Sequence, residues 1–465
     1  MMRRARTMLA ACALAAVTVG ALSAQQNYSL EQLTDAALAT NPDILQLGSA
    51  LQADRQELSG ARASLYPTVD FQNTYSYIAN PTGYTIGKGS LGVIPLPVSL
   101  GGPVDLPQSD ITVPLALYNW NVNFALTVTQ PIYLWGKIRS NIALRQTVVT
   151  ADGVKLTKRQ DDMRTMLDVN YYTLYYLNRL VALLDEQKQV ADDMLKIAED
   201  SYAAGQITDA DLTAKRMALR AITHAVVAAD GQRENALINL RYLSGLPLSG
   251  ADSVAFRSVR TDLSAQPLPP ASALIDRALG KNSDIMLSTV SEAVSKSRLD
   301  IARSGTIIKP ELSLNLQFAY GGPQVPLLGG SWYTEDNWVA NLTLVVDSTL
   351  FDGGKSAAAV GSAEAALAQA RFQTQSAVRD ISLYIAQTRN ELDTIGKNIR
   401  YYQSRVADTR EVEKYQQHLL DSGSGSKLDY YQKRVDVFSE QAQVIEQELA
   451  YASRYFTLRN AVGGF

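Results

Sequence analysis

Residues 119–137 read NWNVNFALTVTQPIYLWGK, and residues 337–355 read NWVANLTLVVDSTLFDGGK. Both stretches begin with Asn-Trp, continue with alternating apolar and polar residues, and end in Gly-Lys at the start of a long proline-free segment. Strict alternation is typical of a strand with one apolar face, and apolar residues three and four positions apart are typical of a helix. The two stretches therefore predict the same unit twice, a strand that turns into a long helix.

The similarity extends over most of the chain. Gly205, Asp211 and Gly245 recur 218 positions later as Gly423, Asp429 and Gly463. Upstream, at a larger offset, Asp35, Asn41, Asp43 and Pro67 correspond to Asp276, Asn282, Asp284 and Pro310. Self-similarity of this kind predicts an internal two-fold repeat, with one supersecondary unit used twice. We assign residues 25–250 to the first copy and residues 251–465 to the second.

The first 24 residues have the composition of a secretory signal peptide. Arg3, Arg4 and Arg6 are followed by a short apolar stretch, and cleavage is expected after Ser23 or Ala24. Cys12, the only cysteine, fits a lipoprotein cleavage pattern, but the apolar stretch before it is shorter than such signals require. We therefore expect a mature chain without cysteine, disulfide or thiol chemistry.

Composition excludes several classes of protein. Hydrophobic residues make up 46% of the chain and charged residues 19%, which is enough for a packed core. The formal net charge of −3, without a basic stripe, argues against nucleic acid as a partner.

Four segments of about 10–13 residues alternate strictly and predict four strands. Their apolar residues are Val69, Phe71, Tyr75 and Tyr77; Trp120, Val122, Phe124, Leu126 and Val128; Leu312, Leu314, Leu316, Phe318 and Tyr320; and Trp338, Leu342, Leu344 and Val346. Such strands occur in a half-buried sheet of a soluble domain, and equally in a membrane barrel whose apolar side faces lipid. Aromatic residues favour the membrane, because belts of Trp and Tyr mark its interfaces. The interface candidates are Tyr75, Tyr77, Trp120, Tyr133, Trp135, Tyr320, Trp332 and Trp338.

Helices are predicted for the remaining repeated segments. Lys137–Ala203 and Lys355–Asp421 would each form a helix about 100 Å long, which requires lateral partners as in a coiled coil. Turns at Gly205 and Gly423 lead to returning helices at Asp211–Tyr242 and Asp429–Leu458. Shorter helices are predicted at Ser29–Thr40, Asp43–Ser64, Ala271–Lys281 and Asp284–Ser304.

Four strands cannot close a membrane barrel, which starts at eight strands, and an open edge cannot exist in lipid. Several copies must therefore share one barrel. Two chains would give eight strands and a filled interior, and three would give twelve strands with room for a channel. The segments Asn80–Leu117 and Gly321–Asp336, rich in proline and glycine, are expected to be loops at the cell-exterior end.

The order of these elements resembles the TolC-like outer membrane efflux proteins over essentially the whole mature chain. The resemblance rests on Asn41-Pro42-Asp43 and Asn282-Ser283-Asp284, on Trp120 and Trp338, on the two strand-to-helix junctions, and on the turns at Gly205 and Gly423. It implies an α+β membrane protein: a homotrimer with a twelve-stranded β-barrel in the outer membrane, four strands per chain, continued by a long α-helical barrel through the periplasm.

The resemblance also implies a function and partners. Such a protein is the passive outer-membrane exit duct of a tripartite efflux or type I secretion system. Its partners are outer-membrane lipid, a periplasmic adaptor and an inner-membrane RND or ABC transporter, and it needs no cofactor. The sequence does not distinguish small-molecule cargo from polypeptides, because the pump selects the cargo.

The turns between the long helices are the candidate contacts for the adaptor. They comprise Ala204, Gly205 and Gln206, and Ser422, Gly423 and Ser424, whereas family members carry a Val-Gly-Leu-like tip. The tyrosine and arginine that close the best-known member fall on Leu420 and Gly425, so that lock is absent. Glycine would also be expected at any such helix-to-helix turn for conformational reasons alone.

Three residues near these turns are candidates for a pore constriction. Asp429 matches a tunnel-entrance aspartate of the family, the second charged ring of the family falls on Gln432, and Asp211 is the repeat counterpart of Asp429. Three converging carboxylates would favour cations. The alternative is that Thr208…Asp211 and Ser426…Asp429 are capping boxes, in which the carboxylate only caps the returning helix.

No group of residues supports catalysis or a metal site. His224 and His418 are single and far apart in sequence, and Asp352-Gly353-Gly354 is a turn rather than a phosphate loop. An enzyme on a helical scaffold is therefore disfavoured. The main rival class is a periplasmic helical structural or scaffolding protein, which leaves the apolar strand faces unexplained.

Overall fold

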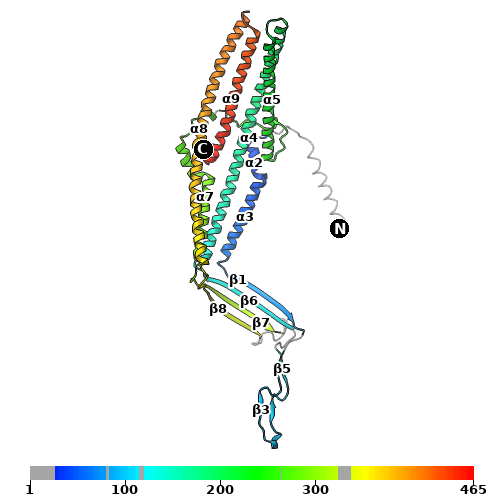
Figure 1. The fold of residues 1–465 in the computed structure, drawn as a ribbon, viewed down its shortest axis with the longest axis vertical. Coiled ribbons are helices and arrows are strands. Elements are labelled where there is room, and N and C mark those ends of the chain that lie inside the picture. The colour runs from blue at the N-terminus through cyan, green and yellow to red at the C-terminus, as the bar shows by residue number, and fades with distance from the viewer. Residues whose placement is uncertain (1–26, 80–82, 115–119, 262, 323–336, 465) are drawn as a thin grey trace, which may run out of the picture. The chain divides into compact units, whose positions relative to one another are not determined.

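The computed structural model describes residues 27–79, 83–114, 120–261, 263–322 and 337–464 (Figure 1). The predicted signal peptide and the aromatic candidate Trp332 lie outside these ranges. The described chain divides into two compact units. One comprises the residues up to Ala53, Val148–Ala293 and the residues from Gln369 onward, and the other comprises Asp54–Thr147 and Val294–Ala368.

The two halves of the chain carry the same order of main elements. The first half has α2 (Leu30–Thr40), α3 (Pro42–Ala63), β1 (Thr68–Tyr77), β6 (Trp120–Tyr133), α4 (Lys137–Ala203) and α5 (Asp209–Ser244). The second half has α6 (Ala271–Lys281), α7 (Ser283–Ser304), β7 (Glu311–Gly322), β8 (Trp338–Asp347), α8 (Lys355–Asp421) and α9 (Lys427–Ala461). The four strands and eight helices expected from the sequence are confirmed, and both long helices have the predicted bounds.

The four long strands form one antiparallel sheet in the order β1-β6-β7-β8 (Figure 1). Tyr77 lies opposite Trp120, and Tyr320 lies opposite Trp338. A single irregularity in the register, between Pro131 and Tyr133, falls at the end of β6. β1 and β8 are the edge strands of this sheet, and no strand among the described residues pairs with their outer sides.

The insert between β1 and β6 is not the plain loop that the sequence predicted. It contains two separate two-stranded ribbons, one of β2 (Gly83–Ile86) with β5 (Ile111–Pro114), and one of β3 (Gly92–Ile94) with β4 (Val104–Leu106). A short 3-10 helix, η1 (Val98–Leu100), lies between β3 and β4. Polar and apolar residues alternate at Thr85-Ile86 and at Ile111-Thr112, which indicates strands. The sequence interpretation gave more weight to the Pro and Gly content and therefore predicted a loop. The counterpart insert lies outside the described residues after Gly322.

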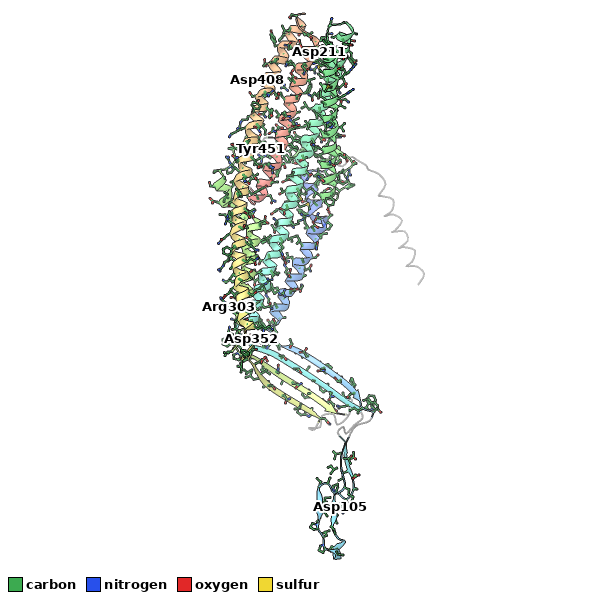
Figure 2. The ribbon with its side chains drawn as sticks, in the orientation of Figure 1. Asp105, Asp211, Arg303, Asp352, Asp408 and Tyr451 are labelled. Atoms are coloured by element: carbon green, nitrogen blue, oxygen red, sulfur yellow. The ribbon has the colours of Figure 1, made fainter. Side chains whose placement is uncertain are left out.

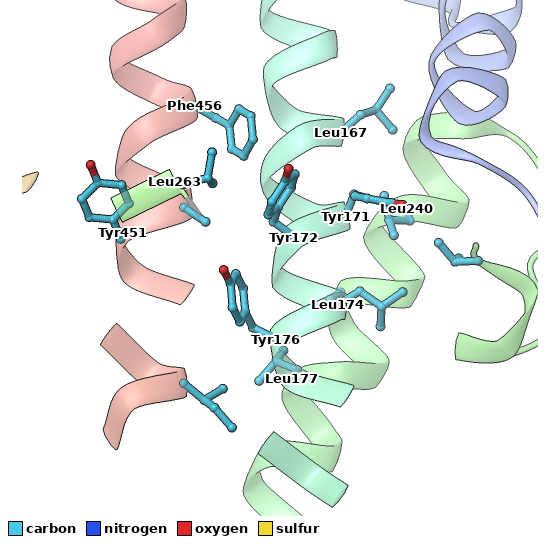
Figure 3. Close-up of a cluster of buried hydrophobic side chains, with 14 of the residues drawn as sticks. Leu167, Tyr171, Tyr172, Leu174, Tyr176, Leu177, Leu240, Leu263, Tyr451 and Phe456 are labelled. Carbon is cyan, nitrogen blue, oxygen red and sulfur yellow. The ribbon is translucent and has the colours of Figure 1, made fainter. Parts of the chain in front are cut away.

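The hydrophobic core of the first unit forms around α4, which contributes a run of buried Leu and Tyr residues (Figure 3). Leu167 and Leu174 on α4 are fully buried, and so is Leu240 on α5. Tyr172 on α4 packs on Phe456 of α9, with ring centroids 4.7 Å apart. The hydroxyl of Tyr171 donates to the carbonyl of Ala255 at 2.6 Å, so the segment that connects the two halves is fastened to α4. Burial of these side chains removes large apolar surfaces from water and holds the helices together.

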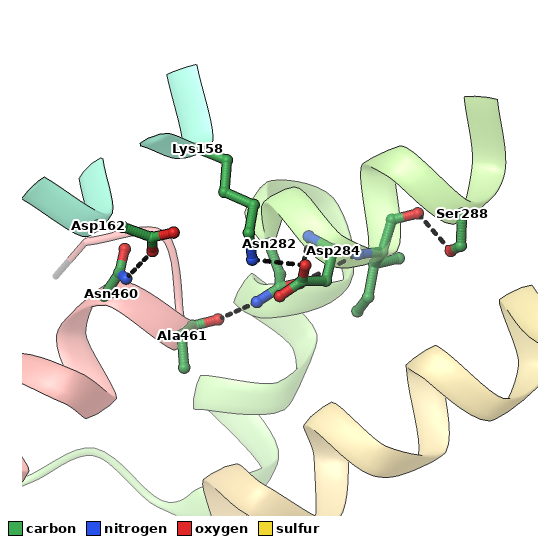
Figure 4. A network of polar contacts seen from close by, with 8 residues as sticks. Lys158, Asp162, Asn282, Asp284, Ser288, Asn460 and Ala461 are labelled. Carbon is green, nitrogen blue, oxygen red and sulfur yellow. Dashed lines mark hydrogen bonds and ion pairs between the residues drawn. The ribbon is translucent and has the colours of Figure 1, made fainter. Parts of the chain in front are cut away.

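Both Asn-X-Asp segments are helix junctions, and Figure 4 shows the second of them, at Asn282. The side-chain oxygen of Asn282 accepts from the backbone N–H groups of Asp284 and Ile285, at 2.9 and 3.1 Å, and thereby caps α7. Its amide donates to the carbonyl of Ala461 at the end of α9, over 2.8 Å. Asn41 caps α3 in the same way through Asp43, at 3.0 Å.

Two neighbouring cations on α4 bind the aspartates of these junctions. Lys158 lies 2.6 Å from the carboxylate of Asp284, and Arg159 forms an ion pair with Asp43. The two aspartates occupy corresponding places in the two halves, so α4 contacts the starts of both α3 and α7.

Candidate functional site

The sheet has one apolar face and one polar face. Cross-strand partners share a face, and the register pairs Phe71 with Leu126, Leu126 with Phe318, and Leu314 with Leu344. Most of the apolar side chains are exposed, including Val69, Phe71, Leu342, Leu344 and Val346. A sheet of this kind in water would normally cover its apolar face, so the strands carry a surface suited to lipid.

The opposite face is polar and carries acidic residues at one end. Gln72, Thr74, Asn123, Thr127, Asn315, Gln317, Asn341 and Thr343 follow the register across all four strands. Glu311 lies opposite Asp347 and pairs with Lys137 at 3.1 Å. A polar face of this composition is compatible with a water-filled interior.

The aromatic candidates gather at the two ends of the strands. Tyr75, Tyr77, Trp120, Tyr320 and Trp338 lie at the end far from the long helices, where the rings of Tyr77 and Trp120 are 4.8 Å apart. Tyr133 and Trp135 lie at the other end, with ring centroids 5.2 Å apart. Trp120 and Tyr133 are the first and last residues of β6. They are separated by about 43 Å along the strand, which a tilt of about 45° reduces to about 30 Å, close to the thickness of a bilayer core.

Trp135 has a backbone conformation that bulky residues rarely adopt. Its φ is 50°, and Gly136 follows with φ 82°, whereas Gly353 and Gly354 have φ 67° and 90° at the corresponding turn. The indole N–H of Trp135 donates to the carbonyl of Pro310 at 2.9 Å, and the Lys309 ammonium lies 5.8 Å from the ring centroid. These contacts hold the strand-to-helix turn in a conformation that the second half achieves with glycine.

The turns that join the long helices to their partners have the same backbone geometry. Gly205 and Gly423 have φ 70° and 78°, and the N–H of each donates to a carbonyl three residues earlier, Tyr202 at 2.9 Å and Leu420 at 3.0 Å. A left-handed glycine of this kind ends the preceding helix, as the conformational explanation predicts. All six adaptor-contact candidates, Ala204, Gly205, Gln206, Ser422, Gly423 and Ser424, are exposed.

The two tip aspartates differ in their surroundings. Asp211 forms the predicted capping box: its carboxylate accepts from the N–H of Thr208 at 3.0 Å and from the Thr208 hydroxyl at 2.7 Å. The hydroxyl bond, followed by the N–H bond, holds the pKa of Asp211 below its usual range. At the other turn the predicted box is not formed, because Ser426 caps α9 by accepting from Leu428 and Asp429 lies exposed on the first turn.

Gln432 forms a contact between two helices. Its side-chain oxygen accepts from the ammonium of Lys215 on α5 at 2.7 Å, and its amide donates to Asp436 at 2.9 Å. Nearby, Val190, Ala191, Met194 and Val435 form a small buried cluster. The three pore candidates therefore include one cap, one exposed carboxylate and one side chain engaged between helices.

Gly425 cannot carry a side chain in this conformation. A Cβ there would lie 2.7 Å from the backbone nitrogen of Leu420 and 2.8 Å from the carbonyl carbon of Leu419. An arginine at this position, as in the best-known member of the family that the sequence resembles, would require a different turn.

Within the described ranges, none of the helices combines the length and apolarity needed to cross a bilayer.

No three His, Cys, Asp or Glu side chains in the described part of the chain gather as a metal ion would need.

Comparison with known proteins identifies the family. Residues 33–246 and 274–464 match the sequence profile described as "Outer membrane efflux protein". The chain belongs to the outer membrane efflux protein family. This family places the protein in the outer membrane with an extension into the periplasm, as predicted.

Individual relatives of this outer membrane efflux protein are distant in sequence. It is 21% identical over 338 residues to the multidrug resistance outer membrane protein MdtP of Escherichia coli O6:H1; the match covers 71% of the chain and 66%, just under two thirds, of that relative. Its fold is similar to that of VceC from Vibrio cholerae, with a TM-score of 0.72 and 15% identity over 94% and 96% of the two chains. The Campylobacter jejuni outer membrane channel CmeC is similar in fold with a TM-score of 0.71. Its sequence identity is 17%, and the match covers 96% of this chain and 91% of CmeC.

Several contacts of this outer membrane efflux protein were missed by the sequence interpretation. Lys158, Arg159 and Lys215 were not singled out, although each joins two helices. Trp135 was assigned only to the membrane interface. Trp135 stands where the second half has Gly353, and this difference could have indicated a left-handed backbone at Trp135.

Proposed function

We propose that three copies of this protein form the outer-membrane exit duct of a tripartite efflux system. Each copy would supply four strands of a twelve-stranded barrel and one third of a helical tunnel. Substrates delivered by an inner-membrane RND or ABC transporter, through a periplasmic adaptor, would pass outward without a catalytic step in this protein.

The sheet is the observation that carries the trimer. It has two open edges, β1 and β8, and its alternating order makes these two strands antiparallel to each other. The β8 edge of one copy can therefore pair with the β1 edge of the next in the antiparallel sense of all the other pairs. Closure through several copies satisfies the edge hydrogen bonds that lipid would leave unpaired.

The polar face of the sheet supports three copies rather than two. Eight strands leave an interior that side chains fill, whereas twelve leave a passage, and a duct requires a passage. The internal two-fold repeat would make the barrel and the tunnel quasi-sixfold, with each half-chain contributing two strands and one long helix.

The tip is proposed as the entrance. Asp429, exposed and outside any capping box, is the stronger candidate for a ring of carboxylates that attracts cations; Asp211 and Gln432 would contribute less because other contacts engage them. The exposed turns at Ala204–Gln206 and Ser422–Ser424 are proposed to meet the adaptor.

The cargo is proposed to be small molecules, since MdtP is described as a multidrug resistance protein. Type I polypeptide secretion is the alternative. Deletion of the gene should raise ethidium accumulation in cells several-fold, and complementation should reverse the change. Unchanged accumulation together with loss of a secreted polypeptide would favour the alternative.

Light scattering of the purified protein in detergent tests the assembly. The expected result is the mass of a homotrimer, together with a band on denaturing gels whose mobility changes when the sample is boiled. A monodisperse monomer that stays in solution without detergent would instead support the periplasmic scaffold.

A further inference from the structure

The insert between β1 and β6 exposes an unusually apolar surface. Residues 83–114 contain three charged residues, Lys88, Asp105 and Asp110, and none between Leu91 and Val104. Leu91, Val98 and Leu100 are 71%, 90% and 70% exposed. Exposed apolar surface of this extent on a chain segment marks a contact site.

The ribbon of β2 and β5 has two unlike faces. Ile86 lies opposite Ile111, and Val113 lies two positions after Ile111 on the same strand, which places these three residues on one face. Thr85 and Thr112 lie opposite each other on the second face, with their hydroxyl oxygens 3.0 Å apart. Ile111 and Val113 are 47% and 49% exposed, so the described residues leave this apolar face uncovered.

The ribbon of β3 and β4 is divided less sharply. Gly92, Ile94, Val104 and Leu106 share one face through the pairs Gly92–Leu106 and Ile94–Val104, and Val93 lies opposite Asp105 on the other. The carboxylate of Asp105 is 3.4 Å from the ammonium of Lys88, whose backbone N–H donates to Asp110 at 2.7 Å. Both carboxylates of the insert therefore bind Lys88, Asp105 through its ammonium and Asp110 through its backbone N–H.

Two-stranded ribbons need a covering layer. An isolated hairpin is at best marginally stable in water, and neither ribbon is hydrogen-bonded to the four-stranded sheet (Figure 1). We propose that the ribbons of the three copies pack against one another through their apolar faces, with the threonine face toward water. This inference rests on the trimer proposed above.

A second copy fits better than other occupants. The insert joins the end of β1 to the start of β6. The three inserts of a trimer would therefore all emerge from the same end of the barrel. A twelve-stranded barrel has a radius of about 12 Å, and twelve residues from Gly83 to Ile94 reach up to about 40 Å. The tether keeps the three ribbons at a high effective concentration. A lipid surface is disfavoured, because the insert has two carboxylates and one ammonium and would be repelled by anionic headgroups.

Cysteine cross-linking distinguishes the faces. Val113→Cys places a thiol on the apolar face, and the control Thr112→Cys places one on the adjacent threonine face. With a short bismaleimide on intact cells, we expect the cross-linked dimer fraction to be at least five-fold higher for Val113→Cys than for Thr112→Cys. Ile111→Cys should behave like Val113→Cys, and labelling of each variant with an impermeant maleimide confirms that it is folded and at the surface.

The outcomes separate this inference from the trimer. If light scattering gives a trimer and Val113→Cys cross-links no more than Thr112→Cys, the ribbons do not pack together and the inference is wrong. Cross-linking of Val113→Cys to a protein other than this chain would also overturn it. A monomer by light scattering would remove the proposed function itself.

Discussion

Lys215 on α5 donates a hydrogen bond to Gln432 on α9 over 2.7 Å, close to the turns that form the tip. Each helix belongs to a different half of the chain. The other hydrogen bond of Gln432, to Asp436, stays within α9, so Gln432 reaches the other returning helix through Lys215. Asp211, labelled in Figure 2, lies four residues before Lys215 on α5.

Lys215→Met should loosen the tip. The substitution keeps the length of the side chain but removes the donor, so the two returning helices lose a contact of about 1 kcal/mol. We expect more frequent or larger openings in planar-bilayer recordings. Lys196→Met is the control, because Lys196 pairs with Asp193 on its own helix and is exposed. Identical traces for the two variants would show that the Lys215 contact does not restrain the tip.

Asp429→Asn and Asp211→Asn should have different effects. The first removes an exposed carboxylate from the proposed entrance and should lower cation selectivity and weaken block by trivalent cations. The second disturbs a capping box and should lower only the midpoint of thermal unfolding. Because the pKa of Asp211 is lowered, its stabilising effect should be present at neutral pH and be lost as the pH falls below about 4. Equal effects of both variants on selectivity would contradict this assignment.

Asp168→Asn should stabilise the folded protein at neutral pH. Burial raises the pKa of Asp168 to about 6, although Arg459 at 3.9 Å partly offsets this effect. Since the folded-state pKa is raised, ionisation destabilises the fold as the pH rises from about 4 to 6. The variant should gain on the order of 1–3 kcal/mol at pH 7.5 and lose this slope in thermal unfolding. Asp161→Asn, at a more exposed carboxylate of α4, should keep the slope.

Trp135→Phe and Gly353→Ala should each destabilise the strand-to-helix turn of their own half, for different reasons. Trp135→Phe removes the hydrogen bond to Pro310 while leaving the left-handed backbone, and should cost about 1 kcal/mol. Gly353→Ala introduces a Cβ at φ 67° and should cost about 1–2 kcal/mol. Chemical unfolding of the purified protein measures both. A neutral Trp135→Phe would mean that ring packing alone holds the turn.

An epitope tag after Gly101 should be accessible on intact cells. Gly101 lies at the end of η1 in the insert, and the proposed barrel would place this insert outside the cell. Antibody labelling without permeabilisation is the measurement, with a tag after Ala204 as the periplasmic control. Labelling of the Gly101 tag only after permeabilisation would mean that the topology is inverted.

The sequence by itself determined the elements and their faces. The proline-free segments between the Gly136 and Gly205 turns, and between Gly354 and Gly423, defined both 67-residue helices, because backbone breakers act locally. Period-two alternation defined which strand residues share a face, since that property depends only on position along the chain. The repeat defined which residues of the two halves correspond.

Tertiary structure decided what residues with similar local sequences do. Thr208…Asp211 and Ser426…Asp429 have the same spacing, yet only the first forms a capping box. Lys158 binds Asp284 and Arg159 binds Asp43, each more than a hundred positions away in the sequence. Lys215 on α5 binds Gln432 on α9. Such pairings depend on how helices pack and on the space around each side chain, as at Gly425, and no local pattern encodes them.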